Sequence, residues 1–207
     1  FTHILFVSCA GGGGSFDAGM LYYMPQTWAS DNTDPIERLT IQFGTSMCYP
    51  ASSMGAHVSA CDRTGIETKA AVAMAGTFGY ELDPKEMSDE DKAKVKEQVK
   101  DYHRFYNVIH FGDLYRIIAP TDDEFKCAWE HVAKDKSEAL LTVVIKNRAP
   151  HDFLLIKMKG LDPDKYYRDE TDGEIYSGAL LMNAGINLTD GTLSAGRSVV
   201  RYFTEVK

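Results

Sequence analysis

The sequence predicts an α/β region that is followed by an all-β region. The apolar run at residues 4–8 ends near a run of glycines, which is typical of a fully buried strand in a parallel sheet. Two segments with strong helix signals follow, one after Asp34 and one after Ser88. From about Tyr115 onward, β-like apolar segments alternate with turn signals, as in an antiparallel sheet.

The first helix is predicted to begin at Pro35, just after a weaker strand at residues 26–30. Asp34 is a suitable N-cap, proline is favoured at the first helical position, and Glu37 has the spacing of a capping box. Apolar side chains then recur at helical intervals. They predict a single apolar face, formed by Ile36, Leu39, Phe43 and Met47.

The second helix is predicted from about Ser88 to Asn107. Ser88 caps it, acidic residues crowd its first turn, and its buried side is predicted to hold Val95, Val99, Tyr102 and Tyr106. Residues 49–69, between the two helices, read as irregular. Residues 74–79 combine glycines with other small residues, which favours close packing against another element.

The region after Tyr115 predicts a small antiparallel sheet domain, arranged as a sandwich. Its β-like segments are residues 140–145, 153–159 and 198–203, and in the second of these Leu154, Ile156 and Met158 share one face. Asp-Pro and Asp-Gly pairs that begin at positions 162, 172 and 190 are turn signals. The boundary between the two regions is predicted near residues 110–115.

Composition limits the class of protein. The 207 residues are 44% hydrophobic and 25% charged, as in a globular protein, and no apolar stretch approaches the ~20 residues of a membrane helix. A net charge of −8 without a basic stripe argues against nucleic acid as a partner. The four cysteines lack metal-ligand spacing, so we expect no metal, reduced thiols and a cytoplasmic location. The chain opens on Phe1 rather than methionine, so we expect a truncated or processed product.

The glycine run after the first strand allows three interpretations. Phosphate binding is disfavoured, because neither the P-loop pattern nor the dinucleotide spacing is present. The run is otherwise either a flexible turn or a loop that lets backbone amides and Cys9 approach a ligand closely. The last interpretation fits the C-terminal end of a parallel strand, where the active sites of barrel enzymes lie.

The acidic residues of the next segment also leave alternatives. Asp34 is explained as a helix cap. Asp31 follows a predicted strand and precedes that cap, so its carboxylate is either a hydrogen-bonding loop group or a catalytic acid. Trp28 is either a core residue or a wall of a pocket, and His57 has no metal-like pairing with a nearby acid in the sequence.

The segment from Cys9 to Arg38 resembles the signature of glycoside hydrolase family 36, the bacterial α-galactosidases. It reads Cys-Ala-Gly-Gly-Gly-Gly-x-Phe-Asp-x-Gly-Met-Leu-Tyr-Tyr-x-Pro-Gln-x-Trp-x-Ser-Asp-Asn-Thr-Asp-x-Ile-Glu-Arg. Similarity continues through residues 49–50, 54–58, 73–82 and 160–163.

The resemblance implies a fold, a reaction and a set of site residues. Residues 1–112 would be the final strands and helices of a (β/α)8 TIM barrel, and residues 113–207 the family's C-terminal β-sandwich. The reaction would be retaining hydrolysis of terminal α-galactosides such as melibiose or raffinose, with no cofactor, by an enzyme that is a homo-oligomer when complete. Asp31 corresponds to the general acid/base, and the positions that would bind substrate are Cys9, Ala10, Gly11, Gly12 and Ser30.

Retaining hydrolysis also requires a second carboxylate as nucleophile. In the family this residue lies in a Lys-Trp-Asp motif, and the chain contains no such triplet. A complete barrel takes about 250 residues, so only its final two strands are expected before the sandwich. We therefore expect no α-galactosidase activity from this chain alone. Ser15 and Lys69 stand where the family has arginine, and neither replacement is conservative for an ion pair.

Other functions remain open. Within the same chemistry, a galactosyl transferase or an α-N-acetylgalactosaminidase is compatible with these residues. From a different class, the chain would be a non-catalytic carbohydrate-binding module. Such a module would bind glycans through exposed aromatic residues after position 115, for which the candidates are Trp129, Tyr166, Tyr167 and Tyr176.

Overall fold

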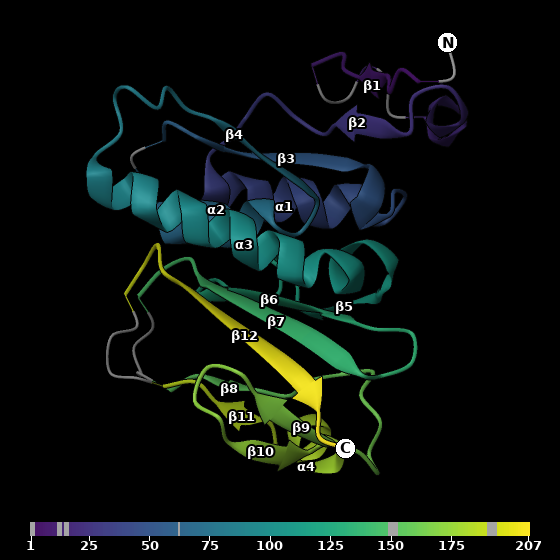
Figure 1. Cartoon of the computed structure of the whole chain (residues 1–207), viewed down its shortest axis with the longest axis vertical. Coiled ribbons are helices and arrows are strands. Elements are labelled where there is room, and N and C mark those ends of the chain that lie inside the picture. The colour runs from purple at the N-terminus through teal and green to yellow at the C-terminus, as the bar shows by residue number, and fades with distance from the viewer. Residues whose placement is uncertain (1–2, 12–13, 15–16, 62, 149–152, 190–193) are drawn as a thin grey trace. The chain divides into compact units, whose positions relative to one another are not determined.

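The computed structural model describes residues 3–11, 14, 17–61, 63–148, 153–189 and 194–207 (Figure 1). The chain divides into two compact units, residues 1–103 and 104–207. Each unit has its own sheet system. No helix in the described ranges combines the length and the apolar character that a bilayer-spanning segment requires.

The first unit is an α/β structure around a parallel sheet of four strands in the order β1-β2-β3-β4. The strands are β1 (Val7–Ser8), β2 (Gln26–Trp28), β3 (Met54–Ser59) and β4 (Thr77–Glu81). The helices are α1 (Pro35–Thr45), α2 (Ile66–Ala73) and the start of α3 (Asp89–Phe111), with short 3-10 turns at Ala18–Tyr22 and Ala51–Ser53. Helices α1 and α2 lie on the same side of the sheet (Figure 1). The parallel arrangement predicted from residues 4–8 is confirmed.

The core of the first unit is formed mainly by β3 and α2. Met54, Ala56 and Val58 alternate along β3 and are almost completely buried. Small residues allow the neighbouring backbone to come close, as predicted for residues 74–79. A Cβ atom at Gly76 would lie 2.4 Å from the carbonyl oxygen of Met54, so no larger residue fits there without a shift.

The prediction that residues 49–69 are irregular is wrong, because they contain β3 and the start of α2. Both elements are short and rich in alanine and glycine, so their hydrophobic periodicity is weak. Residues 77–81 were not predicted as a strand either and form β4, so the described part of the first unit has four parallel strands where two were expected.

The first strand is shorter and more exposed than predicted. Only Val7 and Ser8 pair with β2, and the side chains from Ile4 to Val7 are between 47% and 60% exposed. β1 lies at the edge of the described sheet, with β2 as its neighbour. In the described part of the chain, this apolar run therefore has a neighbouring strand on one side only.

The buried face of α1 is more polar than predicted. Leu39 is buried, but Met47 lies beyond the helix and is 58% exposed. The buried face instead includes Arg38 and Gln42, at 2% and 6% exposure. Their donors bind backbone carbonyls: Arg38 donates to Ser30 O and Gly55 O, and Gln42 Nε2 donates to Val72 O, whereas Gln42 Oε1 has no hydrogen-bond partner among the described residues. A search for apolar periodicity cannot detect a face that is held by such bonds.

The helix predicted from Ser88 exists, and Ser88 accepts from the backbone N–H of Asp91 as expected of a cap. It continues to Phe111. Its buried positions differ from the prediction, because Val99 and Tyr106 are 37% and 41% exposed, whereas the positions just before them are buried. The actual buried residues of α3 are Gln98, Phe105, Val108 and Ile109.

The second unit contains a six-stranded antiparallel sheet and a two-stranded one. The larger sheet has the order β10-β9-β12-β7-β6-β5. Its strands are β5 (Asp113–Ile118), β6 (Lys126–Val132), β7 (Glu138–Ile145), β9 (Tyr166–Asp169), β10 (Ile175–Ser177) and β12 (Ser198–Glu205). The smaller sheet pairs β8 (Leu155–Ile156) with β11 (Ile186–Asn187), and helix α4 spans Gly178–Asn183.

One hydrophobic cluster joins both sheets of the second unit. It contains Leu141 and Val143 of β7, Phe203 of β12 and Leu181 of α4, together with residues of β8 and β11. The predicted alternation in residues 153–159 is confirmed, since its three apolar members belong to the cluster. Gly173 has a φ of +80°, which confirms the turn at Asp172-Gly173. The turn predicted at positions 190–191 lies outside the described residues.

A carboxyl group is buried in this cluster. Glu130 lies on β6 between Ala128 and Val132, both of which belong to the core, and it is completely buried. Burial raises the pKa of Glu130 to about 8, although a hydrogen bond from the backbone N–H of Lys159 and the charges of Lys159 and Lys136 act in the opposite direction. One carboxyl oxygen has no hydrogen-bond partner among the described residues.

Replacement of Arg38 by methionine tests the polar packing of α1. We expect Arg38→Met to destabilise the first unit by about 2–4 kcal/mol, because two buried carbonyl groups lose a charged donor. Urea unfolding followed by Trp28 fluorescence, in a Trp129→Phe background, reports on this unit alone. Arg63→Met is the matched control, since Arg63 is 51% exposed and its ion pairs are worth less than about 1 kcal/mol. Equal losses for both variants would contradict this account of α1.

Replacement of Glu130 by glutamine tests its burial. The pKa is 4.5 for an ordinary glutamate and about 8 in the folded chain, so stability falls as the pH rises between these values. Glu130→Gln removes this loss while it keeps an acceptor for Lys159 N–H. We expect the variant to be more stable by about 1–3 kcal/mol at pH 8 and to differ little near pH 4.5, by denaturant unfolding. Glu124→Gln, at an exposed position, is the control. A stability gain of Glu130→Gln that is independent of pH would contradict the explanation by a raised pKa.

Candidate active site

The carboxyl ends of the parallel strands gather their loops at one edge of the sheet. Ser8 of β1 is paired with Thr27 of β2, so the loop that begins at Cys9 and the loop that follows Trp28 start side by side. Trp28 is paired with Gly55 of β3. In open and closed parallel sheets, ligands bind at this edge.

Asp31 is exposed at this edge, and its two oxygens have different surroundings. Oδ1 accepts a hydrogen bond of 3.1 Å from the indole Nε1–H of Trp28. Oδ2 faces the glycine loop, since a Cβ atom at Gly11 would lie 3.9 Å from it. Gly11 has a φ of +60°, which glycine adopts without the strain that a side chain would cause. The fold therefore brings together Asp31 and Gly11, two of the positions predicted from the sequence.

The other predicted positions lie on the same loops. Cys9 and Ala10 are exposed, and the carbonyl of Ala10 accepts from the backbone N–H of Gly14 at 3.1 Å. The hydroxyl of Ser30 accepts from Asn32 N, so it stabilises the loop around Asp31. Gly12 and Ser15 lie outside the described residues.

Asp34 has the structural role that its position predicts. Its Oδ1 accepts from the backbone N–H groups of Ile36 and Glu37, at 2.9 and 3.1 Å. Burial would raise the pKa of Asp34, but the hydrogen bonds from Glu37, Cys61 and Ile36 and the charge of Arg63 lower it below its usual value. In a complete capping box, the Glu37 side chain would accept a hydrogen bond from the backbone N–H of Asp34. Here Glu37 pairs with Arg63 instead, and the backbone N–H of Asp34 donates to Asn32 Oδ1.

Trp28 packs against a cation and an imidazole. The guanidinium carbon of Arg38 lies 4.8 Å from the indole centroid, and the ring of His57 lies 4.5 Å away with 36° between the planes. His57 Nδ1 is 3.0 Å from Glu81 Oε1, an acidic neighbour in space that the sequence analysis did not identify. His57 and Glu81 are 24 positions apart in the sequence and lie close together because β3 and β4 are adjacent. A local sequence pattern does not reveal this adjacency.

Arg38 is the site's buried charge. Burial lowers its pKa to about 10, while the negative charge of Glu81 acts in the opposite direction, so Arg38 stays protonated at neutral pH. Sequence reasoning missed its role. The only available signal was its place in the segment quoted above, where it follows Glu37 on a helix whose start is well defined.

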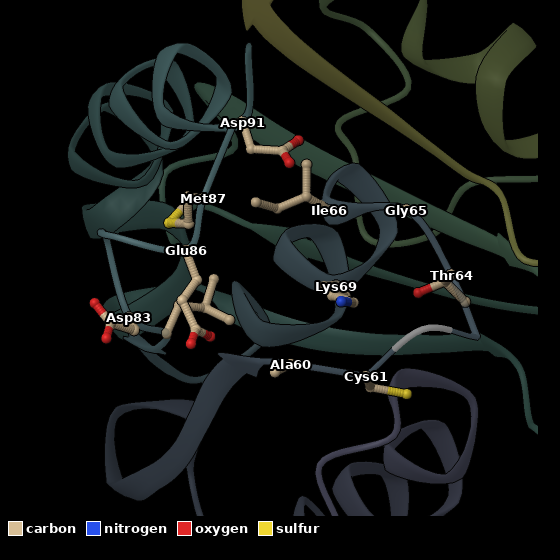
Figure 2. A pocket seen from close by; sticks show the side chains of 11 residues that line it. Ala60, Cys61, Thr64, Gly65, Ile66, Lys69, Asp83, Glu86, Met87 and Asp91 are labelled. Carbon is tan, nitrogen blue, oxygen red and sulfur yellow. The ribbon is translucent and has the colours of Figure 1, made fainter. Parts of the chain in front are cut away.

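A separate pocket of about 450 Å³ lies at the ends of β3 and β4 (Figure 2). Cys61 and Thr64 come from the connection after β3, Lys69 from α2, and Asp83 and Glu86 from the connection after β4. None of the sequence-predicted site residues lines it. Lys69, the position at which the resemblance predicts arginine, does line it.

The arrangement around Asp31 provides one available carboxyl group for proton transfer. Two further acids of this region are engaged, Asp34 as a helix cap and Glu81 with His57. Within the described ranges, no group of three or more His, Cys, Asp or Glu side chains is placed to hold a metal ion. The geometry therefore suits a general acid or base that acts together with groups from elsewhere.

Two family models match the chain. The Melibiase family matches residues 1–112, and the glycosyl hydrolase family 36 C-terminal domain matches residues 126–203.

Curated relatives and solved structures agree with these matches. The chain is 47% identical to the bifunctional alpha-galactosidase/sucrose kinase AgaSK of Mediterraneibacter gnavus over 91% of its length, and 47% identical to alpha-galactosidase AgaA of Geobacillus stearothermophilus over 91%. It spans only 21% and 26% of these relatives. A solved AgaA variant in complex with raffinose superposes on the whole chain with a TM-score of 0.95 and 42% identity, and the chain covers 29% of that structure. The chain therefore belongs to the melibiase family, glycosyl hydrolase family 36.

Proposed function

We propose that this chain supplies the general acid/base, Asp31, to the active site of a retaining α-galactosidase. The observation that carries the proposal is the position of Asp31: an exposed carboxyl at the carboxyl edge of a parallel sheet, beside the loop of Gly11. In the first step Asp31 protonates the leaving oxygen, and in the second it removes a proton from the attacking water. Substrates are terminal α-galactosides such as melibiose and raffinose, in line with the raffinose complex of the relative.

The remaining predicted positions form part of the sugar pocket in this proposal. Cys9, Ala10, Gly11 and Gly12 contribute from the loop after β1, and Ser30 contributes from the loop after β2. Trp28 then lies at the edge of the pocket. The contact between the Gly11 loop and Asp31 supports this assignment, because both loops face one position.

The proposed architecture extends the same assignment to the whole chain. Residues 1–112 are the last part of a (β/α)8 barrel and residues 113–207 a β-sandwich. The parallel sheet with α1 and α2 on one side supports the first, and the core shared by two antiparallel sheets supports the second. We also propose a homo-oligomer for the complete enzyme, and a cytoplasmic location, which the four free cysteines support.

The carbohydrate-binding alternative has weaker support. Of the four aromatic residues that suggest it, only Tyr166 is largely exposed, at 59%. Tyr167 is fully buried, and its hydroxyl donates to the carbonyl of Lys136. Tyr176 packs against the hydrophobic core. Galactosyl transfer and α-N-acetylgalactosamine hydrolysis use the same acid/base and differ in acceptor and C2 recognition.

The chain alone is expected to be inactive. Retaining hydrolysis needs two carboxyl groups about 5–5.5 Å apart, and the neighbours of Asp31 are engaged in structural contacts. Hydrolysis of a chromogenic α-galactoside by the purified chain measures this, with the Asp31→Asn chain as a baseline for contaminating activity. Turnover by the unmodified chain above that baseline would show that another of its carboxylates serves as nucleophile.

Asp31 is tested in a chimaera in which this chain replaces the matching 26% of AgaA. We expect Asp31→Ala to reduce kcat/KM on melibiose by about 10²–10⁴-fold, the usual contribution of general acid–base catalysis. With an activated aryl galactoside, azide should restore turnover and form α-galactosyl azide. This retained configuration distinguishes a lost acid/base from a lost nucleophile, which would give the β-azide.

The matched control is Asp34→Asn in the same chimaera. Asparagine caps helices as well as aspartate does, so this variant should retain activity within a few-fold. An Asp31→Ala variant that behaves like the control would refute the assignment of Asp31.

A further inference from the structure

We propose that Trp28 is a positioning residue for the acid/base, and that its indole N–H holds Asp31 Oδ1 so that Oδ2 carries the transferred proton. This inference rests on the proposed function of Asp31. Its structural basis is the pair of contacts at the carboxyl group: Trp28 Nε1 is 3.1 Å from Oδ1, while Oδ2 is the oxygen on the side of Gly11.

The hydrogen bond gives the two oxygens different tasks. An indole N–H is a donor only, so Oδ1 must accept a hydrogen bond from it. Oδ1 therefore cannot carry a proton on the side that faces the indole. Oδ2 is then the oxygen that is protonated in the acid form of Asp31. It gives this proton to the leaving oxygen of the substrate as the glycosidic bond breaks, and it recovers a proton from water in the second step.

Two neighbouring side chains hold the indole in place. Arg38 lies near the ring at 4.8 Å, and its guanidinium is anchored by bonds of 3.2 Å to Ser30 O and 2.9 Å to Gly55 O. His57 contacts the ring at a centroid distance of 4.5 Å and is bound in turn to Glu81. Both anchors come from regular elements, α1 and β3, rather than from the loop that carries Asp31.

A glycine in the neighbouring strand allows the indole to lie close to the backbone of β3. A Cβ atom at Gly55 would lie 3.0 Å from Cε3 of Trp28, which is tighter than most real contacts, so glycine allows the ring to lie close against β3. Trp28, Arg38, Gly55 and His57 therefore fix the direction of the Nε1–H bond. A fixed donor reduces the freedom of a carboxyl group that is otherwise exposed on a loop.

A positioning role predicts selectivity for the leaving group. Departure of a sugar alcohol requires protonation by the acid, whereas departure of an acidic phenol does not. Trp28→Phe keeps an aromatic ring against Arg38 and His57 but removes the donor. In the AgaA chimaera we expect this variant to lose about 10–100-fold in kcat/KM on melibiose and less than about 3-fold on a dinitrophenyl α-galactoside. Trp129→Phe, the same substitution in the second unit, should change neither.

The outcomes separate the two proposals. If Asp31→Ala itself shows no leaving-group selectivity, the proposed function fails, whatever Trp28 does. If Asp31→Ala is selective and Trp28→Phe reduces both substrates equally, or neither, the positioning role is wrong.

A second measurement uses the chain itself and needs no activity. The chain has two tryptophans, so an indole ¹⁵N–¹H spectrum has two signals, and Trp129→Phe identifies that of Trp28. We expect the Trp28 N–H to exchange with water at least several-fold faster in Asp31→Ala than in the unmodified chain. An unchanged exchange rate would mean that the hydrogen bond does not form, and it would overturn the inference even if the Trp28 variant of the chimaera fails to fold.

Discussion

The geometry of the first unit depends on the hydrogen bonds that the buried guanidinium of Arg38 donates. A charge at 2% exposure is unfavourable unless its donors are satisfied, and here two of them bind the carbonyls of Ser30, just after β2, and of Gly55, near the start of β3. These bonds tie α1 to the loop that carries Asp31 and to β3. The nearby carboxylate of Glu81 favours the charged form. Because the cation also faces the indole of Trp28, one group joins the helix, the sheet and the loop of Asp31.

The same group explains why the sequence predicted the existence of α1 but not its orientation. The start of the helix depends on local chemistry, the cap at Asp34 and the proline after it, and that chemistry is visible in the sequence. Its buried face depends on Arg38 and Gln42, whose partners lie 17 and 30 residues away. Apolar periodicity pointed to Met47 instead, which is exposed. Similarly, β3 and α2 were missed because alanine and glycine allow close packing without a strong hydrophobic signal.

The second unit was predicted as an antiparallel β structure and three of its strand segments were predicted, but β5, β6, β9, β10, β11 and α4 were not. β7, β12 and the face of Leu154 and Ile156 follow from their apolar side chains alone. Glu130 is the exception, a carboxyl within a core strand, and its proton at neutral pH is a consequence of burial that composition does not reveal. For the site, the sequence identified the two loops and the residues on them. It did not identify His57, Glu81 or Arg38, since their roles depend on neighbours in space.

These contacts separate two requirements of the acid/base role proposed for Asp31. Its orientation depends on nearby rigid elements, and in this chain those elements are all present: β2 carries the indole, β3 supplies the stacked imidazole, and α1 supplies the cation. Its chemistry depends on a second carboxylate across the sugar, which the described neighbours of Asp31 do not provide. A carboxyl group can therefore be correctly oriented without being catalytic. It follows that the indole–carboxylate bond belongs to the fold of the first unit, and that, in the proposed mechanism, catalysis begins only when a nucleophile is placed opposite Oδ2.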